Sequence, residues 1–288
     1  MARALSDQGL GLVLVAVSTL AWSTAGLFTR AISEDLFTTL VWRGLFGTAG
    51  LLAVLLWRDG VKGLRDFGRL GRAGWAYAAI SGLGMYAYIG ALRMSSIAHV
   101  SIIYAAVPFM TAGLAWVMMG TRPTRDAVIA STVAFLGAVL MVGLGGDGNL
   151  LGDGLAVVMT LGMALMMVIA RKHPEIPTLP AGITSAVFSV LIALPFAGAM
   201  PAGDQLWLLA GFGLINSTLG FALFLMGSAR IAPIQTALLG ALEAPIAPVW
   251  VWLVYGETPT LPTVIGGTVV MVAVLGHILR QYRQNAKA

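Results

Sequence analysis

A glutamate inside a long apolar run is the residue whose type and position most directly predict chemistry. Residues 240–248 read Gly-Ala-Leu-Glu-Ala-Pro-Ile-Ala-Pro, so Glu243 lies two residues before Pro245 and about one turn after Gly240. An acidic side chain at the centre of a bilayer costs about 2.5–3.5 kcal/mol on insertion scales, and such residues mark functional sites by default. A proline here breaks the helix, which lipid tolerates only beside protein or a wet cavity. The stretch predicts a functional site at mid-membrane; a structural kink with a neutral, hydrogen-bonded glutamic acid is the alternative.

Arg43 is the second formal charge predicted well inside the membrane. At a rise of 1.5 Å per residue, Glu243 lies about 18 Å and Arg43 about 20 Å from the inner ends of their spans, so they share a depth. The structural alternative is a buried ion pair between the two, or an Arg43 that snorkels outward. In the functional hypothesis, Arg43 or nearby helix N-termini bind a substrate carboxylate, while Glu243 binds an amine or a proton.

Other side chains in the apolar runs could line a pathway. Rings inside a pore can stack on an apolar substrate and make cation–π contacts to an amine, although packing or lipid contact is the simpler interpretation of each ring alone. An asparagine in mid-span either bonds a neighbouring helix or lines the pathway. The methionines at 159, 163 and 166 share a helix face, for which core or lipid contact is the simpler interpretation. His99 could titrate near neutral pH, but a lone interfacial histidine is usually a satisfied polar group. The candidates, besides Glu243 and Arg43, are Trp22, Tyr86, Tyr104 and Asn216.

The elements that position these residues are membrane spans. The chain has 288 residues, of which 58% are hydrophobic and only 10% are charged, whereas soluble domains have about 25% charged residues. It has no cysteine, which excludes disulfides and thiolate chemistry. Crossing about 30 Å of hydrocarbon needs about 20 apolar residues. Ten segments meet this length: 10–29, 36–57, 73–92, 95–119, 127–145, 154–170, 178–199, 205–229, 231–255 and 260–279.

The basic residues orient these spans. With the N-terminus in the cytoplasm, 14 of the 17 lysines and arginines fall in cytoplasmic segments, and only Arg30 and Arg93 fall outside. Cytoplasmic loops carry this excess in membrane proteins. The pattern predicts an all-α membrane protein with ten transmembrane helices and both termini in the cytoplasm.

The two halves of the chain repeat a pattern. Residues 93–124 and 230–260 each begin with arginine, carry a mid-span proline (Pro108 and Pro245, 137 residues apart) and end in a G-x-x-P-T turn. Five spans per half, an odd number, require the second half to enter the membrane from the opposite side. The prediction is two inverted five-helix repeats, residues 1–146 and 147–288, an arrangement that recurs in secondary transporters. Candidate breaks or hinges are Pro108, Pro245, Gly84, Gly220 and Gly240.

Together these features resemble the drug/metabolite transporter superfamily, and within it the ten-span EamA-like family. The residues that carry the resemblance are the paired mid-helix prolines, the L-E-A-P stretch, the G-E-T-P-T turn at 256–260 and Arg43. Thr121 departs from the family, whose first half often has glutamate there. The resemblance implies a transporter in the cytoplasmic (inner) membrane of a bacterium, similar to exporters of aromatic and other neutral amino acids. It implies no cofactor, with proton coupling left open.

The sequence argues against an enzyme. It has no H-E-x-x-H, G-x-S-x-G or G-x-x-x-x-G-K-[ST] motif and no His and carboxylate cluster with metal-ligand spacing. The leading hypothesis is a secondary transporter that moves a small metabolite by alternating access, with proton antiport and facilitated diffusion both open. The partners expected are a small-molecule substrate and the lipid bilayer, with no nucleic acid, and one chain can form the pathway. The alternatives are a lipophilic-cation drug exporter, a multispan lipid enzyme and a scaffold.

Overall fold

A computed structural model of the chain describes residues 2–95, 97–142, 149–256 and 258–287. Within these residues every regular element is a helix. The elements are α1 (Ala2–Ser23), α2 (Ala25–Ala31), α3 (Leu36–Asp59), η1 (Gly60–Arg69), α4 (Gly71–Met94), α5 (Ile97–Tyr104), α6 (Val107–Met119), α7 (Arg125–Val142), α8 (Leu150–Lys172), α9 (Thr178–Ala193), η2 (Leu194–Phe196), α10 (Gly203–Phe212), η3 (Gly213–Gly220), α11 (Phe221–Ser228), α12 (Pro233–Gly240), α13 (Glu243–Tyr255) and α14 (Leu261–Lys287).

The expected spans match these helices closely. Nine of them, among the described residues, are long and apolar enough to cross a membrane. The tenth expected span, 73–92, is α4, which has 24 residues and packs along α8 and α9 inside the bundle. Its glycines and tyrosines make it less apolar than the other nine, because neither residue type adds much hydropathy. The boundary predicted between the two halves, at 146/147, lies outside the described residues.

Three of the spans are interrupted helices, and a fourth contains a π-helical segment. One break separates α1 from α2 at Thr24, and others separate α5 from α6 and α12 from α13. The span over 203–228 stays helical but passes through a π-helical segment, η3. Such segments release backbone carbonyls from the regular ladder and are frequent at functional sites. The breaks therefore gather polar backbone groups in the interior of an apolar bundle.

Two of the breaks have the same geometry. The bounds of α5 and α6 recur in α12 and α13 at a constant spacing of 136 residues, and α6 and α13 both end in a left-handed glycine, Gly120 and Gly256. By this spacing Val107 corresponds to Glu243. The prolines do not correspond, because Pro108 is the second residue of α6 and Pro245 is the third residue of α13. Both lie in the first turn, where an N–H has no intrahelical partner to lose.

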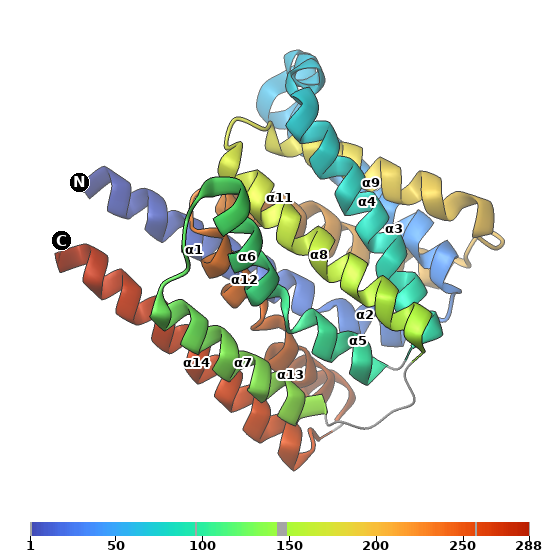
Figure 1. The fold of residues 1–288 in the computed structure, drawn as a ribbon. Coiled ribbons are helices and arrows are strands. Elements are labelled where there is room, and N and C mark those ends of the chain that lie inside the picture. Colours follow the sequence, from blue (N-terminus) through green and yellow to red (C-terminus); the bar gives the residue numbers. More distant parts are fainter. Residues whose placement is uncertain (1, 96, 143–148, 257, 288) are drawn as a thin grey trace.

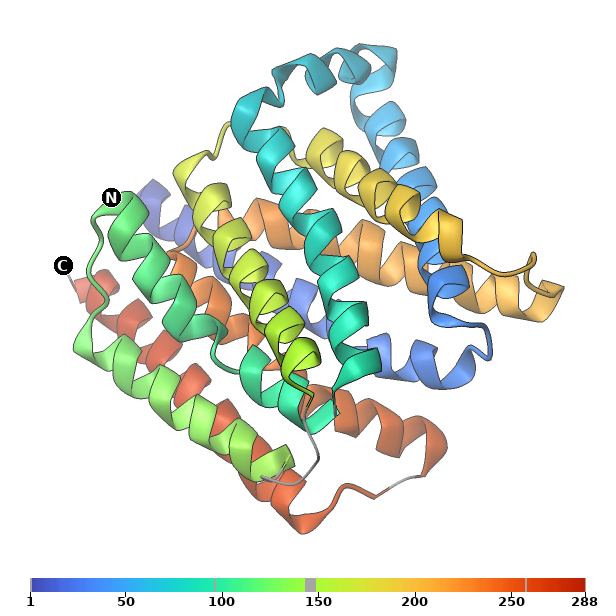
Figure 2. The ribbon, with the colours of Figure 1, turned by 45° about the vertical axis from the view of Figure 1, so that its right-hand side comes forward.

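The helices pack as pairs that leave an interior space. In Figures 1 and 2, α7 and α14 lie side by side along one flank, while α3, α4 and α9 form the opposite flank. The first pair approaches backbone to backbone, since a Cβ added to Gly266 would lie 2.4 Å from the carbonyl oxygen of Gly137. Small residues allow this close approach between helices in membranes. The broken helices α5–α6 and α12–α13 lie between these flanks and face the site.

Candidate functional site

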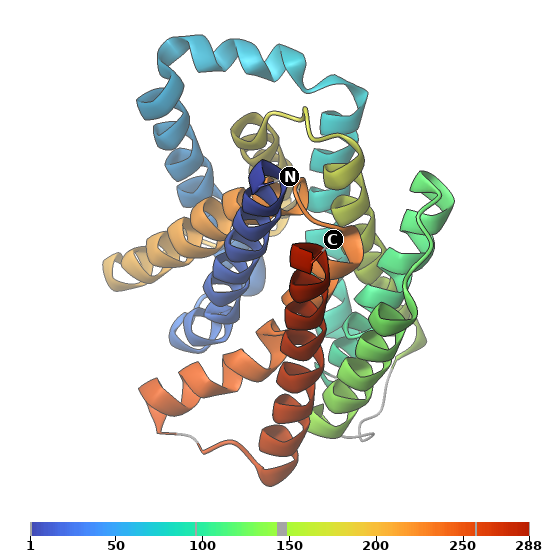
Figure 3. The ribbon, with the colours of Figure 1, turned by 90° about the vertical axis from the view of Figure 1, so that its left-hand side faces the viewer.

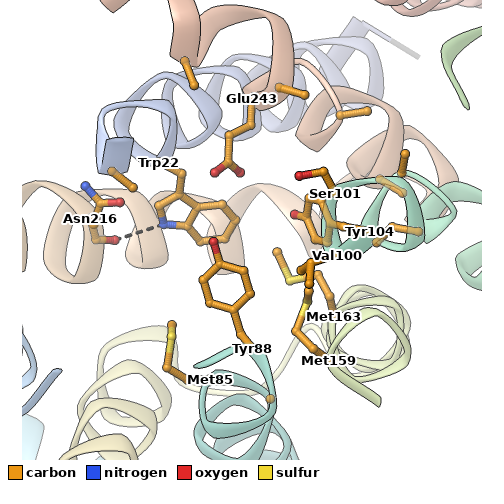
Figure 4. A pocket seen from close by; sticks show the side chains of 18 of the residues that line it. Trp22, Met85, Tyr88, Val100, Ser101, Tyr104, Met159, Met163, Asn216 and Glu243 are labelled. Atoms are coloured by element: carbon orange, nitrogen blue, oxygen red, sulfur yellow. Dashed lines mark hydrogen bonds between the residues drawn. The ribbon is translucent and has the colours of Figure 1, made fainter. Parts of the chain in front are cut away.

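One cavity of about 830 Å³ occupies the interior between these helices. This volume lies within the range of small-molecule binding sites. Residues of both halves of the chain line it, from Trp22 in α1 to Val270 in α14. Figure 4 shows the side chains that meet there, with Glu243 on one wall and methionines on the other.

Glu243 enters the cavity as the first residue of α13. The helix break places its carboxylate at a helix N-terminus, where the macrodipole favours negative charge. Figure 4 shows the carboxylate directed into the space bounded by Trp22, Tyr88 and Tyr104. Among the described residues, no hydrogen-bond donor or cation lies within bonding distance of it. The carboxylate is therefore available to a substrate or a proton.

Arg43 also lines the cavity, from α3. Its guanidinium carbon lies 4.7 Å from the centroid of the Phe212 ring, which is a cation–π distance. The ion pair with Glu243 considered as a structural alternative is not formed between these two described residues. The guanidinium instead lies over the ring of Phe212, in α10. The cavity thus holds a cation and an anion that do not neutralise each other by contact.

Trp22 and Asn216 join α1 to the π-helical segment. The indole Nε1 of Trp22 donates to the backbone oxygen of Asn216 at 3.0 Å, the bond drawn in Figure 4. The Asn216 amide donates to the Ala21 carbonyl and to the Thr24 hydroxyl, each at 3.2 Å. Asn216 is only 5% exposed but is also among the cavity-lining residues. Of its two expected roles, its side-chain amide performs the first: it bonds the neighbouring helix at the α1–α2 break.

Two tyrosines line the cavity, and one expected tyrosine does not. Tyr104, at the end of α5, and Tyr88, in α4, line it, whereas Tyr86 is absent from the lining. The expectation for Tyr86 is corrected in favour of Tyr88. Positions two apart on a helix are separated by about 200°, so only one of the pair can face inward.

Some of the expected hinge residues line the cavity and others do not. Pro108 and Gly84 line the cavity, but Pro245 does not, because it packs against Gly267 of α14; Pro248 lines the cavity instead. Gly220 also lies outside the lining and contacts the Trp22 ring, where an added Cβ would be 2.6 Å from Nε1.

Gly240, the last residue of α12, is the remaining expected hinge. It is buried, yet an added Cβ there would meet only the methyl of Met167, at 4.0 Å. It is absent from the cavity lining. The break after α12 thus has room for small changes of backbone without a direct substrate contact.

Several lining residues escaped the sequence interpretation. Met159, Met163 and Met166 line the cavity together with Met167, although core or lipid contact seemed the simpler interpretation. Their spacing on one face of α8 was the pattern that could have identified them. Ser101 and Ser185 also line the cavity, and the buried Ser185 hydroxyl has no hydrogen-bond partner among the described residues. Serines in apolar helices carry no comparable sequence pattern.

Two further expectations concern proton coupling by a histidine and metal binding. The side chain of His99, considered for proton coupling, lies outside the described residues. Among the described residues, no group of three or more His, Asp or Glu side chains could hold a metal ion. The chemistry that the cavity offers is therefore that of separated charges, hydroxyls, aromatic rings and thioethers.

Comparisons with known proteins agree with this architecture. The chain is 26% identical over 272 residues to a protein of Archaeoglobus fulgidus described as an uncharacterized transporter, covering 92% of this chain and 95% of that protein. A solved crystal structure superposes with a TM-score of 0.80 at 20% identity, covering 95% of this chain and 98% of the other, and so shares the fold. The profile of the EamA-like transporter family matches twice, at residues 9–143 and 150–279. The chain belongs to the EamA-like transporter family, as its sequence features predicted.

Proposed function

We propose that the protein exports small neutral metabolites, above all neutral and aromatic amino acids, through the central cavity. The observation that carries the proposal is the pair of separated charges, Glu243 and Arg43, in one cavity whose described residues form no ion pair between them. A zwitterion carries the complementary pair of charges on adjacent groups. Binding it would neutralise both buried charges at once, and an uncompensated buried charge is strongly unfavourable.

Each wall of the cavity then has a role. Glu243 accepts hydrogen bonds from the substrate amine, and Arg43 donates hydrogen bonds to the substrate carboxylate. The substrate side chain lies against Tyr88, Tyr104 and the methionines of α8, which line the remaining walls. Rings stack on aromatic substrates, and flexible thioethers adapt to side chains of different shape. This combination favours a family of related substrates over a single one.

We further propose that transport proceeds by alternating access between two inverted halves. The constant spacing of 136 residues between α5–α6 and α12–α13 supports this, as does the double match of one family profile. Substrate sites of such transporters lie at the repeat interface near the midplane, where broken helices meet. The distribution of lysine and arginine supports cytoplasmic termini. The internal duplication supports a pathway formed within one chain, because both halves of the chain line the cavity.

Glu243 is the group through which protons would be coupled to export. Its carboxylate cannot remain charged and unpaired in the cavity when substrate leaves, unless water solvates it. A proton taken from outside would neutralise it for the return step. Facilitated diffusion without this step is the simpler alternative, and a pH gradient distinguishes the two.

Uptake into proteoliposomes tests the proposal. We expect saturable uptake of labelled aromatic and neutral amino acids, accelerated by an imposed pH gradient and competed by unlabelled substrate. Glu243→Gln should lose the gradient dependence, while Glu175→Gln, the same change on an exposed loop, should retain it. Absence of uptake of every amino acid by folded protein would refute the substrate class.

A lipophilic-cation drug exporter is the second candidate. The observation that favours it is the carboxylate of Glu243 beside three aromatic rings in Figure 4, because a cation can pair with the carboxylate and stack on the rings. Such a substrate has no carboxylate and makes no ion pair with Arg43. The two candidates differ in competition. Cationic dyes that block transport while zwitterions do not would establish the second candidate.

A further inference from the structure

The segment η1 connects α3 to α4 and does not contribute to the cavity. Two glycines with left-handed backbones, Gly60 (φ +60°) and Gly71 (φ +56°), turn the chain sharply before and after it. These turns lay η1 across the ends of the two helices, as the crossing blue segment of Figures 2 and 3 shows. Because α3 is long and apolar enough to cross a membrane and α4 is the tenth expected span, we expect η1 at the level where the membrane meets water.

The side chains of η1 form rows, because a 3₁₀-helix has three residues per turn and aligns positions i and i+3. We call Val61 and Leu64 the apolar row; they are 75% and 43% exposed, and the next residue of the row, Phe67, packs onto the bundle. Trp57, at the end of α3, is 87% exposed. We call Lys62 and Arg65 the basic row; both are exposed. Exposed apolar and basic rows thus lie next to each other on one short helix.

The acidic residues around η1 are already paired. Asp59 binds Arg58 at 2.8 Å, and Asp66 binds Arg69 at 3.1 Å. Lys62 and Arg65 have no carboxylate within 4.0 Å among the described residues. The basic row therefore presents two positive charges without a local counter-ion, at the rim of the membrane.

We propose that η1 is a binding surface for anionic phospholipids. The apolar row and Trp57 insert among the lipids, and the basic row binds the phosphates of anionic headgroups beside them. This is the arrangement of helices that lie in the interfacial plane, with an apolar face buried and a basic face toward the headgroups. Charge complementarity selects anionic over zwitterionic lipid, because only the former supplies net negative charge.

The absence of cysteine makes the insertion directly measurable. The full-length protein would carry one spin label at a time, in liposomes of phosphatidylglycerol and phosphatidylcholine. The labels attach to single cysteines introduced as Val61→Cys, Leu64→Cys, Lys62→Cys and Arg65→Cys. We expect the labels at 61 and 64 to collide mainly with oxygen, which concentrates in the membrane, and the labels at 62 and 65 to collide mainly with a water-soluble nickel chelate. The ratio of the two collision rates should differ several-fold between the rows. Glu175→Cys, on an exposed loop, is the aqueous control. Four sites as accessible to the chelate as the control would overturn insertion.

Lipid selectivity needs a second measurement. A fluorophore on Leu64→Cys should be quenched several-fold more by brominated phosphatidylglycerol than by brominated phosphatidylcholine. The double substitution Lys62→Gln with Arg65→Gln should remove this preference, whereas Arg171→Gln, in a basic residue at the end of α8, should keep it. Equal quenching by the two lipids in the parent protein would overturn the anionic selectivity.

Discussion

The two broken helices, α5–α6 and α12–α13, have the same geometry and different chemistry. Both break over two residues, both resume with a proline in the first turn, and both end in a left-handed glycine. At the position where the second half-helix resumes, both residues line the cavity, but one is the apolar Val107 and the other is Glu243, whose carboxylate is directed into the cavity.

This difference separates architecture from function. The break itself is a property of the fold and occurs in both halves, so a broken helix alone does not make a binding site. A helix N-terminus supplies partial positive charge at both breaks, but only one has a carboxylate there to be stabilised. The cavity is therefore asymmetric in charge although the two breaks match in geometry, with the anion, Glu243, in the second half of the chain and the cation, Arg43, in the first.

The largest effect is expected from removing that asymmetry. Glu243→Gln keeps the shape of the side chain and removes its charge, so a substrate amine loses a charged partner worth about 2 kcal/mol, or roughly 30-fold in apparent affinity. Binding to purified protein, followed by calorimetry, measures this. Glu175→Gln serves as the control for the same chemical change. If Glu243→Gln binds the substrate with unchanged affinity, the carboxylate does not distinguish the α12–α13 break from the α5–α6 break in binding.

Arg43 tests the other pole of the cavity. Arg43→Gln should weaken binding of an amino acid about 10-fold, since a hydrogen bond to a charged group contributes about 1.5 kcal/mol at the lower end of its range. The corresponding amine without a carboxylate should bind both proteins equally. An equal loss for both ligands would assign Arg43 to packing on Phe212 instead of to the substrate.

The expected hinge glycines sharpen the comparison between the halves. Gly220→Ala forces a Cβ into the Trp22 ring and should destabilise the protein by about 1–3 kcal/mol, as overpacking does. Gly84→Ala meets no atom within 4 Å and should leave the melting temperature in detergent unchanged. Because Gly84 lines the cavity, it acts as a hinge only if Gly84→Ala slows uptake while substrate affinity is unchanged; if uptake, affinity and melting temperature are all retained, it does not.

The smallest effect is expected from the prolines. Pro108→Ala and Pro245→Ala should each change stability by less than about 1 kcal/mol, because first-turn positions lose no intrahelical hydrogen bond and the breaks precede them. Thermal unfolding measures this. A loss of several kcal/mol in either variant would show that the proline, and not the surrounding packing, maintains the break.

Much of the architecture follows from the sequence. Apolar run lengths gave the spans to within a few residues, since hydrocarbon thickness fixes the length of a spanning helix. The resemblance to the EamA-like family is confirmed. Glu243 was identifiable because a charge in an apolar run is costly wherever the run points.

Which side of each helix faces the cavity was decided only by the tertiary structure. Tyr88 replaces Tyr86, Pro248 replaces Pro245, and the methionines of α8 line a wall. Arg43 meets Phe212 in place of Glu243. The physical reason is that a helix in lipid can be apolar on every side, so its sequence carries little periodicity to fix its rotation. Contacts with neighbouring helices fix that rotation, and they exist only once the bundle has formed.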